Sequence, residues 1–340
     1  MSYDRGLEVV KLPHPRVNLV WITDLHMSAI PPGRRGDDYA GAIFDKLRFV
    51  LDLTEKLNGV CLVGGDVFHN KVAKSPGNSL ATIERLIRVF GSYPLGRVWG
   101  AVGNHDLFAD RMDSLPSQPL GLLIAAGCYR DLNREPVLFS NADDSVTVSV
   151  ETFPYATGDK TLQALLNAPP RHPEAKYRVG VVHAYGEPGN GGTLYGEPKI
   201  GYNQVAHLDF DFLLWGHDHS RKETETVGNI THVNLGSMAR AAFSYDEKDR
   251  PVVAAILSFA QDGIRYKEKD IPVKPLEVVF VHADKGVERA GKASNVLDFF
   301  SQMDEAVDGL ETSEPREIAK QLCGDDLQLL QLLLELCNLS

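Results

Sequence analysis

Short apolar runs alternate with longer amphipathic segments along the first half of the chain. Residues 60–63 form an apolar run bounded by glycines, which is typical of a buried parallel strand. Residues 38–57 and about 79–90 carry apolar side chains at helical spacing, so each is expected to form a helix with one buried face. A further strand is expected over 97–102. Strands that alternate with helices predict parallel pairing through right-handed crossovers.

The pattern changes in the second half of the chain. Residues 137–139 and 145–150 are expected to be antiparallel strands of a second sheet that packs face to face with the first. Residues 186–192 are rich in glycine and are expected to form an irregular loop, either mobile or a plain surface connection. Further strands are expected at 232–235, 252–259, 264–267 and 275–281, followed by helices to the end of the chain.

Composition bounds the class of protein. The chain has 340 residues, of which 43% are hydrophobic, and this suits one large globular domain with a smaller appendage. It has no apolar run long enough to span a bilayer, and its first residues lack a secretory signal, so we expect a cytoplasmic protein with no membrane partner. Its four cysteines are scattered and are expected to be reduced thiols. The net charge of −11 argues against strong nonspecific DNA binding by this chain alone.

Polar residues with metal-ligating groups follow five of the apolar runs. Because the carboxyl ends of parallel strands meet at one edge of a sheet, these groups are expected to converge. Carboxylate, amide and imidazole ligands together suit Mn, Fe or Zn, and two such cations can activate water for attack on phosphorus. The groups are Asp24, His26, Asp66, Asn104, His105, His183, His217 and His219.

The motifs that hold these groups resemble the five motifs of the calcineurin-like metallophosphoesterases, in the same order over roughly residues 17–240. They read Asp24-x-His26, Gly65-Asp66, Gly103-Asn104-His105-Asp106, a lone His183, and Gly216-His217-x-His219. The resemblance implies an α/β fold, a two-sheet metallophosphoesterase sandwich of mixed sheets flanked by helices, as a catalytic domain over residues 1–265. Residues 266–340 would be a reduced capping region with C-terminal helices, a small α+β or helical appendage.

The resemblance also implies two divalent metal ions that share a hydroxide. The first would be bound by Asp24, His26, Asp66 and His219, and the second by Asp66, Asn104, His183 and His217. Mn is the expected metal, with Fe, Zn, Mg and Ni as alternatives. His105 would stabilise the transition state or protonate the leaving oxygen.

Finer features resemble the SbcD-type nuclease subunits of double-strand-break repair complexes, namely the Gly-Asp-Val-Phe-His stretch that ends at His69 and the residues 209–212 and 234–237. This implies a DNA exonuclease or endonuclease in which His69 faces the site beside His105, with Asp106 as the third catalytic residue. A small-molecule or nucleotide phosphodiesterase or phosphatase is the alternative. A noncatalytic scaffold that kept the fold is a further one.

The same resemblance implies partners. These are DNA, an SMC-like ATPase of the SbcC type that binds the C-terminal helices, and a second copy of the chain. The leucine-rich residues 325–340 are expected to form a helix, which either docks on its own domain or binds that ATPase.

Several basic and histidine residues have two interpretations. Basic residues that follow the motifs could line the mouth of the metal site, although each one alone is more typical of a solvated surface. They are Arg34, Arg35, Lys71, Lys74, Arg111, Arg221, Lys222 and Arg240. His207, His232 and His282, taken singly, are expected to be structural.

Overall fold

The computed structural model describes residues 8–93, 98–132, 136–194, 197–242 and 250–280. Internal contacts divide the chain into two units, Met1–Val281 and His282–Ser340. The helices expected after residue 281 and the helix expected at 325–340 therefore lie outside the described residues. Within the described ranges, no helix has both the length and the apolar character needed to cross a membrane.

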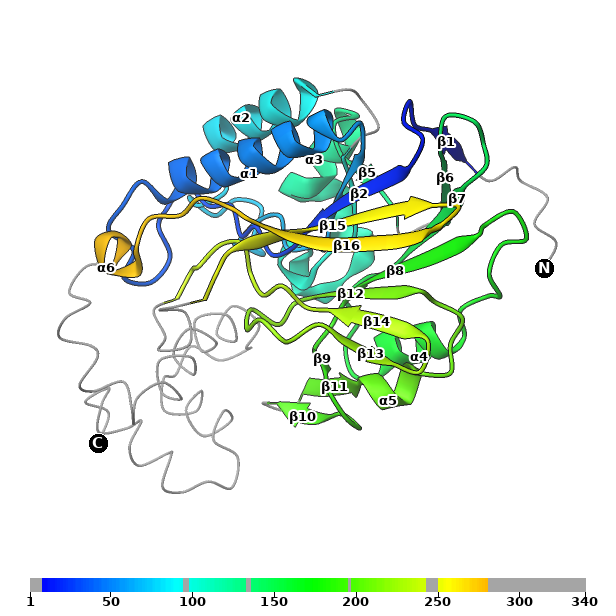
Figure 1. Ribbon diagram of the computed structural model, residues 1–340. Coiled ribbons are helices and arrows are strands. Elements are labelled where there is room, and N and C mark those ends of the chain that lie inside the picture. Colours follow the sequence, from blue (N-terminus) through cyan, green and yellow to red (C-terminus); the bar gives the residue numbers. More distant parts are fainter. Residues whose placement is uncertain (1–7, 94–97, 133–135, 195–196, 243–249, 281–340) are drawn as a thin grey trace. The chain divides into compact units, whose positions relative to one another are not determined.

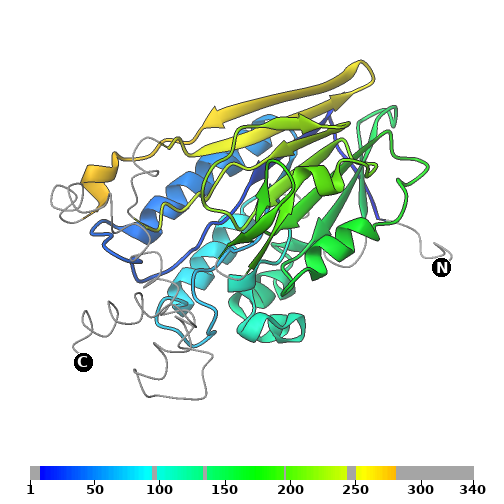
Figure 2. The same cartoon turned by 90° about the horizontal axis from the view of Figure 1, so that it is seen from below.

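The first sheet has six strands in the order β16-β15-β2-β3-β4-β5. Strands β2 to β5 pair in parallel, and β15 pairs antiparallel with both β2 and β16. The bounds are Val17–Ile22 (β2), Val60–Val63 (β3), Val98–Gly100 (β4), Arg130–Asp131 (β5), Val253–Ala260 (β15) and Gly263–Asp270 (β16). The β15–β16 hairpin forms one edge of this sheet (Figure 2).

The second sheet has seven strands in the order β1-β6-β7-β8-β12-β14-β13. Strands β7, β8, β12 and β14 are parallel, whereas β6 and β7 pair antiparallel as expected from the sequence. The bounds are Val9–Lys11 (β1), Val137–Ser140 (β6), Thr147–Phe153 (β7), Tyr177–His183 (β8), Phe212–Gly216 (β12), Glu225–Val227 (β13) and Ile230–Val233 (β14).

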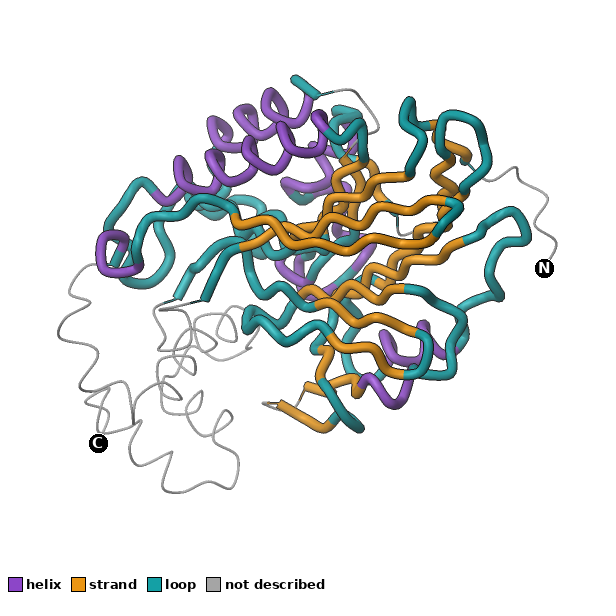
Figure 3. The backbone as a smooth tube through the Cα atoms, in the orientation of Figure 1, coloured by secondary structure: helices purple, strands orange, loops and turns teal. Residues whose placement is uncertain are grey.

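Alternate side chains of the central strand β2 enter two different cores. Val20 and Ile22 pack among the residues of the outer helices, whereas Leu19 and Trp21 pack against the second sheet. This alternation follows from the two-residue period of a strand. The two sheets therefore face each other with helices outside them, which confirms the expected α/β sandwich (Figures 1 and 3).

Helices α1 (Tyr39–Lys56), α2 (Leu80–Gly91) and α3 (Pro119–Ala125) cover the first sheet, and α4 (Lys160–Leu166) and α5 (Tyr202–Val205) pack on the second. Helices α1 and α2 match the predicted segments. Each is capped by a side chain, because Asp38 accepts a hydrogen bond from the Gly41 amide and Ser79 accepts one from the Thr82 amide. Short 3-10 turns occupy Asn104–Asp106, Phe108–Asp110 and Met112–Ser117.

Two predicted elements were wrong. A strand was expected over 275–281, but the chain forms a short helix there, α6 (Leu276–Val279). Leu276 and Val279 of this helix form one apolar cluster with Phe280, which follows it directly. The glycine-rich segment is not fully irregular, since it holds strands β9 (Gly186–Glu187) and β10 (Gly192–Leu194). Both pair with β11 (Glu197–Gly201) in a third sheet.

The domain boundary expected after residue 265 falls inside β16. That strand pairs with β15 from Gly263 to Asp270. The unit that holds both sheets continues to Val281.

Candidate metal centre

Five parallel strands from the two sheets deliver the polar residues that the sequence singled out. Strands β2, β3 and β4 of the first sheet lead into the loops of Asp24, Asp66 and Asn104. Strand β8 of the second sheet ends at His183, and β12 ends just before His217. The carboxyl ends of these strands bring their polar side chains into two groups that share Asp66.

The first group consists of Asp24, His26, Asp66 and His219. The Nε2 atom of His26 lies 2.8 Å from Nε2 of His219, 3.6 Å from Oδ2 of Asp66 and 3.9 Å from Oδ1 of Asp24. The Nε2 atom of His219 lies 3.9 Å from the same Asp24 oxygen. Three of these side chains are buried, whereas that of His219 is 46% exposed, so this group is open to solvent on one side.

The second group consists of Asp66, His183 and His217, with Asn104 among them. The Nε2 atom of His183 lies 3.4 Å from Oδ1 of Asp66 and 3.2 Å from Oδ1 of Asn104. The Nδ1 atom of His217 lies 3.1 Å from the same Asn104 oxygen. Asp66 therefore presents Oδ2 to the first group and Oδ1 to the second.

The donor atoms fit a pair of divalent cations. Two ligand atoms that each lie about 2.1 Å from one cation are about 3.0–3.4 Å apart at octahedral or tetrahedral angles. The separations within the groups, from 2.8 to 3.9 Å, span this range. Carboxylate oxygens, an amide oxygen and imidazole nitrogens together suit Mn, Fe or Zn. One ion could be held by Asp24, His26 and His219, and the other by Asn104, His183 and His217. Asp66 could bind both ions.

The backbone of several of these residues is left-handed. The φ angles of Asp24, His26, Asp66 and His217 are 52°, 43°, 49° and 85°. Outside glycine, Asp, Asn and His adopt this conformation most readily, and it stores strain that the surroundings must hold. Backbone hydrogen bonds between the first two motif loops do so, from the amide of Asp24 to the carbonyl of Gly65 and from the amide of His26 to that of Asp66.

Burial keeps two of the imidazoles neutral. Together with the neighbouring His219 and His105, it lowers the pKa of His26 well below its usual value. Burial and His105 lower the pKa of His69 to about 3. Neutral imidazole is the form that binds a metal ion.

Asp66 and His183 form an ion pair. Burial disfavours the charge on each, but their mutual attraction prevails, so the pKa of Asp66 is held well below its usual range and that of His183 rises to about 9. A divalent cation here would replace the proton on His183.

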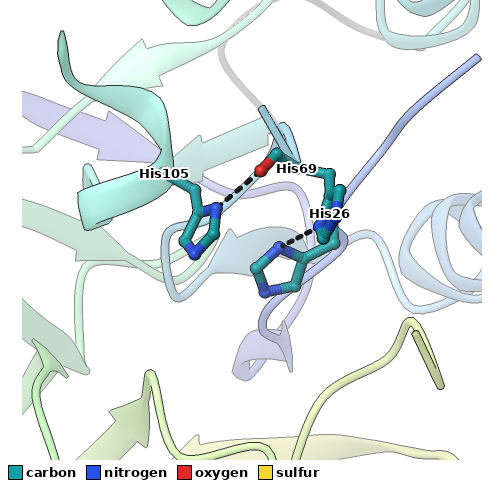
Figure 4. Close-up of side chains that lie close together, drawn as sticks. All are labelled: His26, His69 and His105. Atoms are coloured by element: carbon teal, nitrogen blue, oxygen red, sulfur yellow. Dashed lines mark hydrogen bonds between the residues drawn. The ribbon is translucent and has the colours of Figure 1, made fainter. Parts of the chain in front are cut away.

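His69 and His105 lie beside His26 of the first group (Figure 4). The Nδ1 atom of His105 donates a 2.6 Å hydrogen bond to the backbone carbonyl of His69, and the two rings are stacked with centroids 5.8 Å apart. The Nδ1 atom of His69 lies 3.4 Å from Nδ1 of His26. The structure thus brings both histidines to the place that the resemblance implied.

Asp106 makes different contacts. Its buried carboxylate accepts hydrogen bonds from the amides of Gly103, Val67 and Phe68. These bonds tie the loop after β3 to the loop after β4, and the catalytic role expected for Asp106 stays a prediction. Burial, together with the charge of Asp66, raises the pKa of Asp106 to about 7.

Two residues at the site had no signal in the sequence. Glu197, on β11, lies with Oε2 3.1 Å from Nε2 of His217 and accepts a 2.9 Å hydrogen bond from the Tyr155 hydroxyl. Glu197 and Tyr155 are single residues that belong to no sequence motif. Only the closeness of β11 to the end of β12 in the fold brings Glu197 to His217.

Basic residues near the motifs are largely ion-paired. Five of the eight that the sequence singled out contact a carboxylate at 3.2 Å or less. The pairs are Arg35–Asp37, Lys71–Asp110, Arg111–Asp113, Arg221–Glu268 and Lys222–Asp218. Arg240 donates to backbone carbonyls. These pairs reduce the positive field that the loops offer to a polyanion.

His232 and His207 lie away from both groups. His232 is buried, accepts a 3.1 Å hydrogen bond from the Trp215 indole and stacks on Tyr202 with ring centroids 4.1 Å apart. His207 is exposed, and His282 lies outside the described residues.

Comparisons with known proteins bear on the family. Residues 17–221, more than half of the chain, match the calcineurin-like phosphoesterase family. No curated protein matches the chain.

Two solved structures are similar to it. One is the 5'-nucleotidase precursor from Thermus thermophilus, with a TM-score of 0.43 and 14% identity over 83% of this chain and 59% of that one. The chain thus spans less than two thirds of that protein. The other is a conserved uncharacterized protein, a predicted phosphoesterase, from Streptococcus pneumoniae, with a TM-score of 0.33 and 11% identity over 78% of this chain and 95% of that one.

The family match covers the strands and loops that deliver every residue of both ligand groups. The chain belongs to the calcineurin-like phosphoesterase family.

Proposed function

We propose that this metal-dependent phosphoesterase is a phosphodiesterase that binds two Mn ions and cuts DNA. The observation that carries the proposal is the sharing of Asp66 between two groups of converging ligands, with His105 beside them. Two divalent cations at these positions would activate water and neutralise the charge that develops on the phosphoryl oxygens.

His105 is oriented for proton transfer. Because the His69 carbonyl can only accept a hydrogen bond, the Nδ1 atom of neutral His105 carries the proton. The other ring nitrogen, Nε2, is then the one that takes up a proton and delivers it to a leaving oxygen. The His105 amide also donates to Oδ1 of Asp66, which couples the position of this ring to the shared ligand.

The choice of DNA rests on the nuclease-like motif residues and on His69, which stacks on His105. A second candidate is a nucleotide or small-molecule phosphodiesterase or phosphatase. The ion-paired basic residues and the net charge of −11 favour it, because both weaken attraction to a long polyanion.

One assay separates the candidates. The purified chain is incubated with bis-(p-nitrophenyl) phosphate, a nucleoside monophosphate and end-labelled linear DNA, each with Mn and with a chelator. Cleavage of DNA and of the small diester only with Mn supports the nuclease. Cleavage of the small substrates alone favours the second candidate, and inactivity on all three substrates points to a scaffold.

Replacement of His105 by Ala tests the catalytic assignment. Hydrolysis is expected to fall by about two orders of magnitude or more, because a proton donor is lost, while two Mn ions per chain still bind. Asp66→Asn is the matched control, since it should lose metal as well as activity. Full activity of the His105 variant would remove that residue from the mechanism.

A further inference from the structure

The two nitrogens of His217 face different partners. Its Nδ1 atom lies 3.1 Å from Oδ1 of Asn104, within the second ligand group, and its Nε2 atom lies 3.1 Å from Oε2 of Glu197, outside that group. The His217 side chain is 10% exposed, and that of Glu197 is 42% exposed. Glu197 thus contacts the histidine from the solvent side of the site.

Once a cation takes the lone pair of Nδ1, this geometry selects one form of the imidazole. An ionised carboxylate only accepts hydrogen bonds, so a bond between Glu197 and neutral His217 requires the proton to be on Nε2. The lone pair is then on Nδ1, which points toward Asn104 and the second group. A carboxylate that holds the outer nitrogen of a metal-binding histidine fixes its tautomer and orientation and raises its basicity.

Glu197 is itself held in place. The Tyr155 hydroxyl donates a 2.9 Å hydrogen bond to its Oε1 atom, and the Tyr155 ring lies against His217 with centroids 5.3 Å apart. The amide of Tyr155 in turn donates to the carbonyl of Val102, just after β4. Glu197 is therefore linked to the strand end that leads to Asn104.

The third sheet carries Glu197 to this place. Its strand β11 pairs with β10 at Glu197 itself and with β9 at Ile200. Gly186 of β9 packs so closely on the Trp215 ring that a Cβ there would lie 2.4 Å from it. Because Trp215 is two residues before His217, the sheet is fixed against the strand that supplies the ligand.

We propose that Glu197 is a positioning residue for the second metal ion, which it serves by holding His217 as the Nε2–H tautomer. The inference rests on the proposed metal function of the site. The sheet of β9, β10 and β11 would thus set the affinity of one metal position and not of the other. Among the candidate metal ligands in the described part of the chain, Glu197 forms a hydrogen bond only with His217.

Calorimetric titration of the metal-free full-length chain with MnCl₂ tests the proposal. Wild type is expected to bind two ions. In Glu197→Ala the affinity of one position should fall by about 10- to 100-fold while the other is unchanged. Glu197→Gln should lose less, because its amide oxygen still accepts the Nε2–H bond.

Glu187→Ala is the matched control. Glu187 lies on the same small sheet and pairs with Lys199 at 2.7 Å. This variant should bind both ions like wild type. Equal loss in Glu187→Ala and Glu197→Ala would overturn the proposal, since it would trace the effect to the sheet in general.

Nitrogen-15 NMR of the metal-free chain gives a readout that needs no metal. The His217 ring should hold a hydrogen-bonded proton on Nε2 in wild type and lose that hydrogen bond in Glu197→Ala. If Glu197→Ala fails to fold, the comparison is made with Glu197→Gln, in which the Nε2–H hydrogen bond should persist while the affinity of one position drops.

The two readouts separate the two ideas. A wild-type chain that binds fewer than two ions contradicts the proposed function, whereas the measurement of the Nε2–H bond still decides whether Glu197 holds His217. Unchanged affinity at both positions in Glu197→Ala, or an unchanged Nε2–H hydrogen bond, overturns the role of Glu197.

Discussion

Gly103 packs directly against Asp66, the carboxylate that the two ligand groups share. A Cβ on Gly103 would lie 2.0 Å from Oδ1 of Asp66 and 2.4 Å from its backbone nitrogen. Asp66 already has a left-handed backbone, so it has little freedom to move aside. Space at Gly103 therefore decides whether Asp66 can reach both ligand groups.

Gly103→Ala is accordingly expected to lose both metal ions. Metal content after gel filtration into metal-free buffer is the measurement, with circular dichroism to show that the sandwich is still folded. Gly91→Ala serves as control, because a Cβ at this position of α2 meets no atom within 4 Å. Two retained ions in Gly103→Ala would mean that Asp66 is not the shared ligand.

His232 makes the stability of the fold depend on pH. Burial lowers its pKa to about 4, below the roughly 6.5 of an unfolded chain. The unfolded chain therefore binds more protons between these values, so the stability that neutral His232 contributes is present above pH 6.5 and is lost as the pH falls toward 4. The loss is on the order of 3 kcal/mol.

In His232→Gln this part of the pH dependence should vanish. The free energy of unfolding in urea, measured from pH 7.5 to pH 4, is expected to fall less steeply in the variant than in wild type. His207→Gln changes an exposed histidine and should keep the wild-type slope. A slope in His232→Gln equal to that of wild type would assign the effect to other groups.

At the scale of single residues, the candidate ligands could be predicted because Asp, Asn and His recur at the ends of apolar runs. Their convergence follows from parallel pairing, which the alternation of strands and helices predicts. Glu197 and Tyr155 could not be found in this way. A single Glu or Tyr carries no periodic signal, and its place depends on which loops the fold brings together.

Elements were predictable where one periodicity dominates. The run at 60–63 is strand β3, and the amphipathic pattern at 38–57 is helix α1. The segment 275–281 was ambiguous, because a short apolar run fits a strand or one helical turn equally well. The apolar cluster of Leu276, Val279 and Phe280 in the folded chain favours the helical turn.

The glycine-rich segment shows a different limit. Glycine weakens a strand but does not forbid one when backbone partners are close. Here β9 and β10 each pair with β11. In the turn between β9 and β10, Gly189 and Gly191 adopt positive φ angles.

Strands β7 and β8 contain a buried ion pair whose removal should be costly. Arg178 donates from Nε and one terminal nitrogen to the two oxygens of Glu151 at 2.7 and 2.8 Å. The same guanidinium donates to the carbonyls of Pro169 and Asp209 and lies over the Phe210 ring. Both residues of the pair are buried, so loss of one partner leaves the other charge without its counterion.

Glu151→Ala is expected to lower the free energy of unfolding by about 3–5 kcal/mol in urea denaturation. The exposed pair Arg88–Glu84 on α2 offers a control, since Glu84→Ala should cost at most about 1 kcal/mol. Similar losses in the two variants would contradict the difference between buried and exposed pairs.

At the scale of the whole molecule, two bound cations would stabilise the fold. A ligand that binds only the folded state adds about 2.7 kcal/mol at a free concentration 100 times its dissociation constant. The thermal midpoint should therefore rise with Mn concentration and fall on chelation. Asp66→Asn should show no such rise, and a wild-type midpoint that ignores Mn would contradict the proposed centre.

The pairing of β2 with β15 also bears on how the protein is made. Trp21 lies opposite Ala255, and the loop of Asp24 is held by Ser237 and Met238. At about 5–20 residues per second, the ribosome needs on the order of ten seconds or more to reach β15 after it has made β2. Until then one edge of β2 on the nascent chain lacks its partner and is open to pairing with other chains. The loop of Asp24 can make its contacts with Ser237 and Met238 only after most of the described chain has left the ribosome.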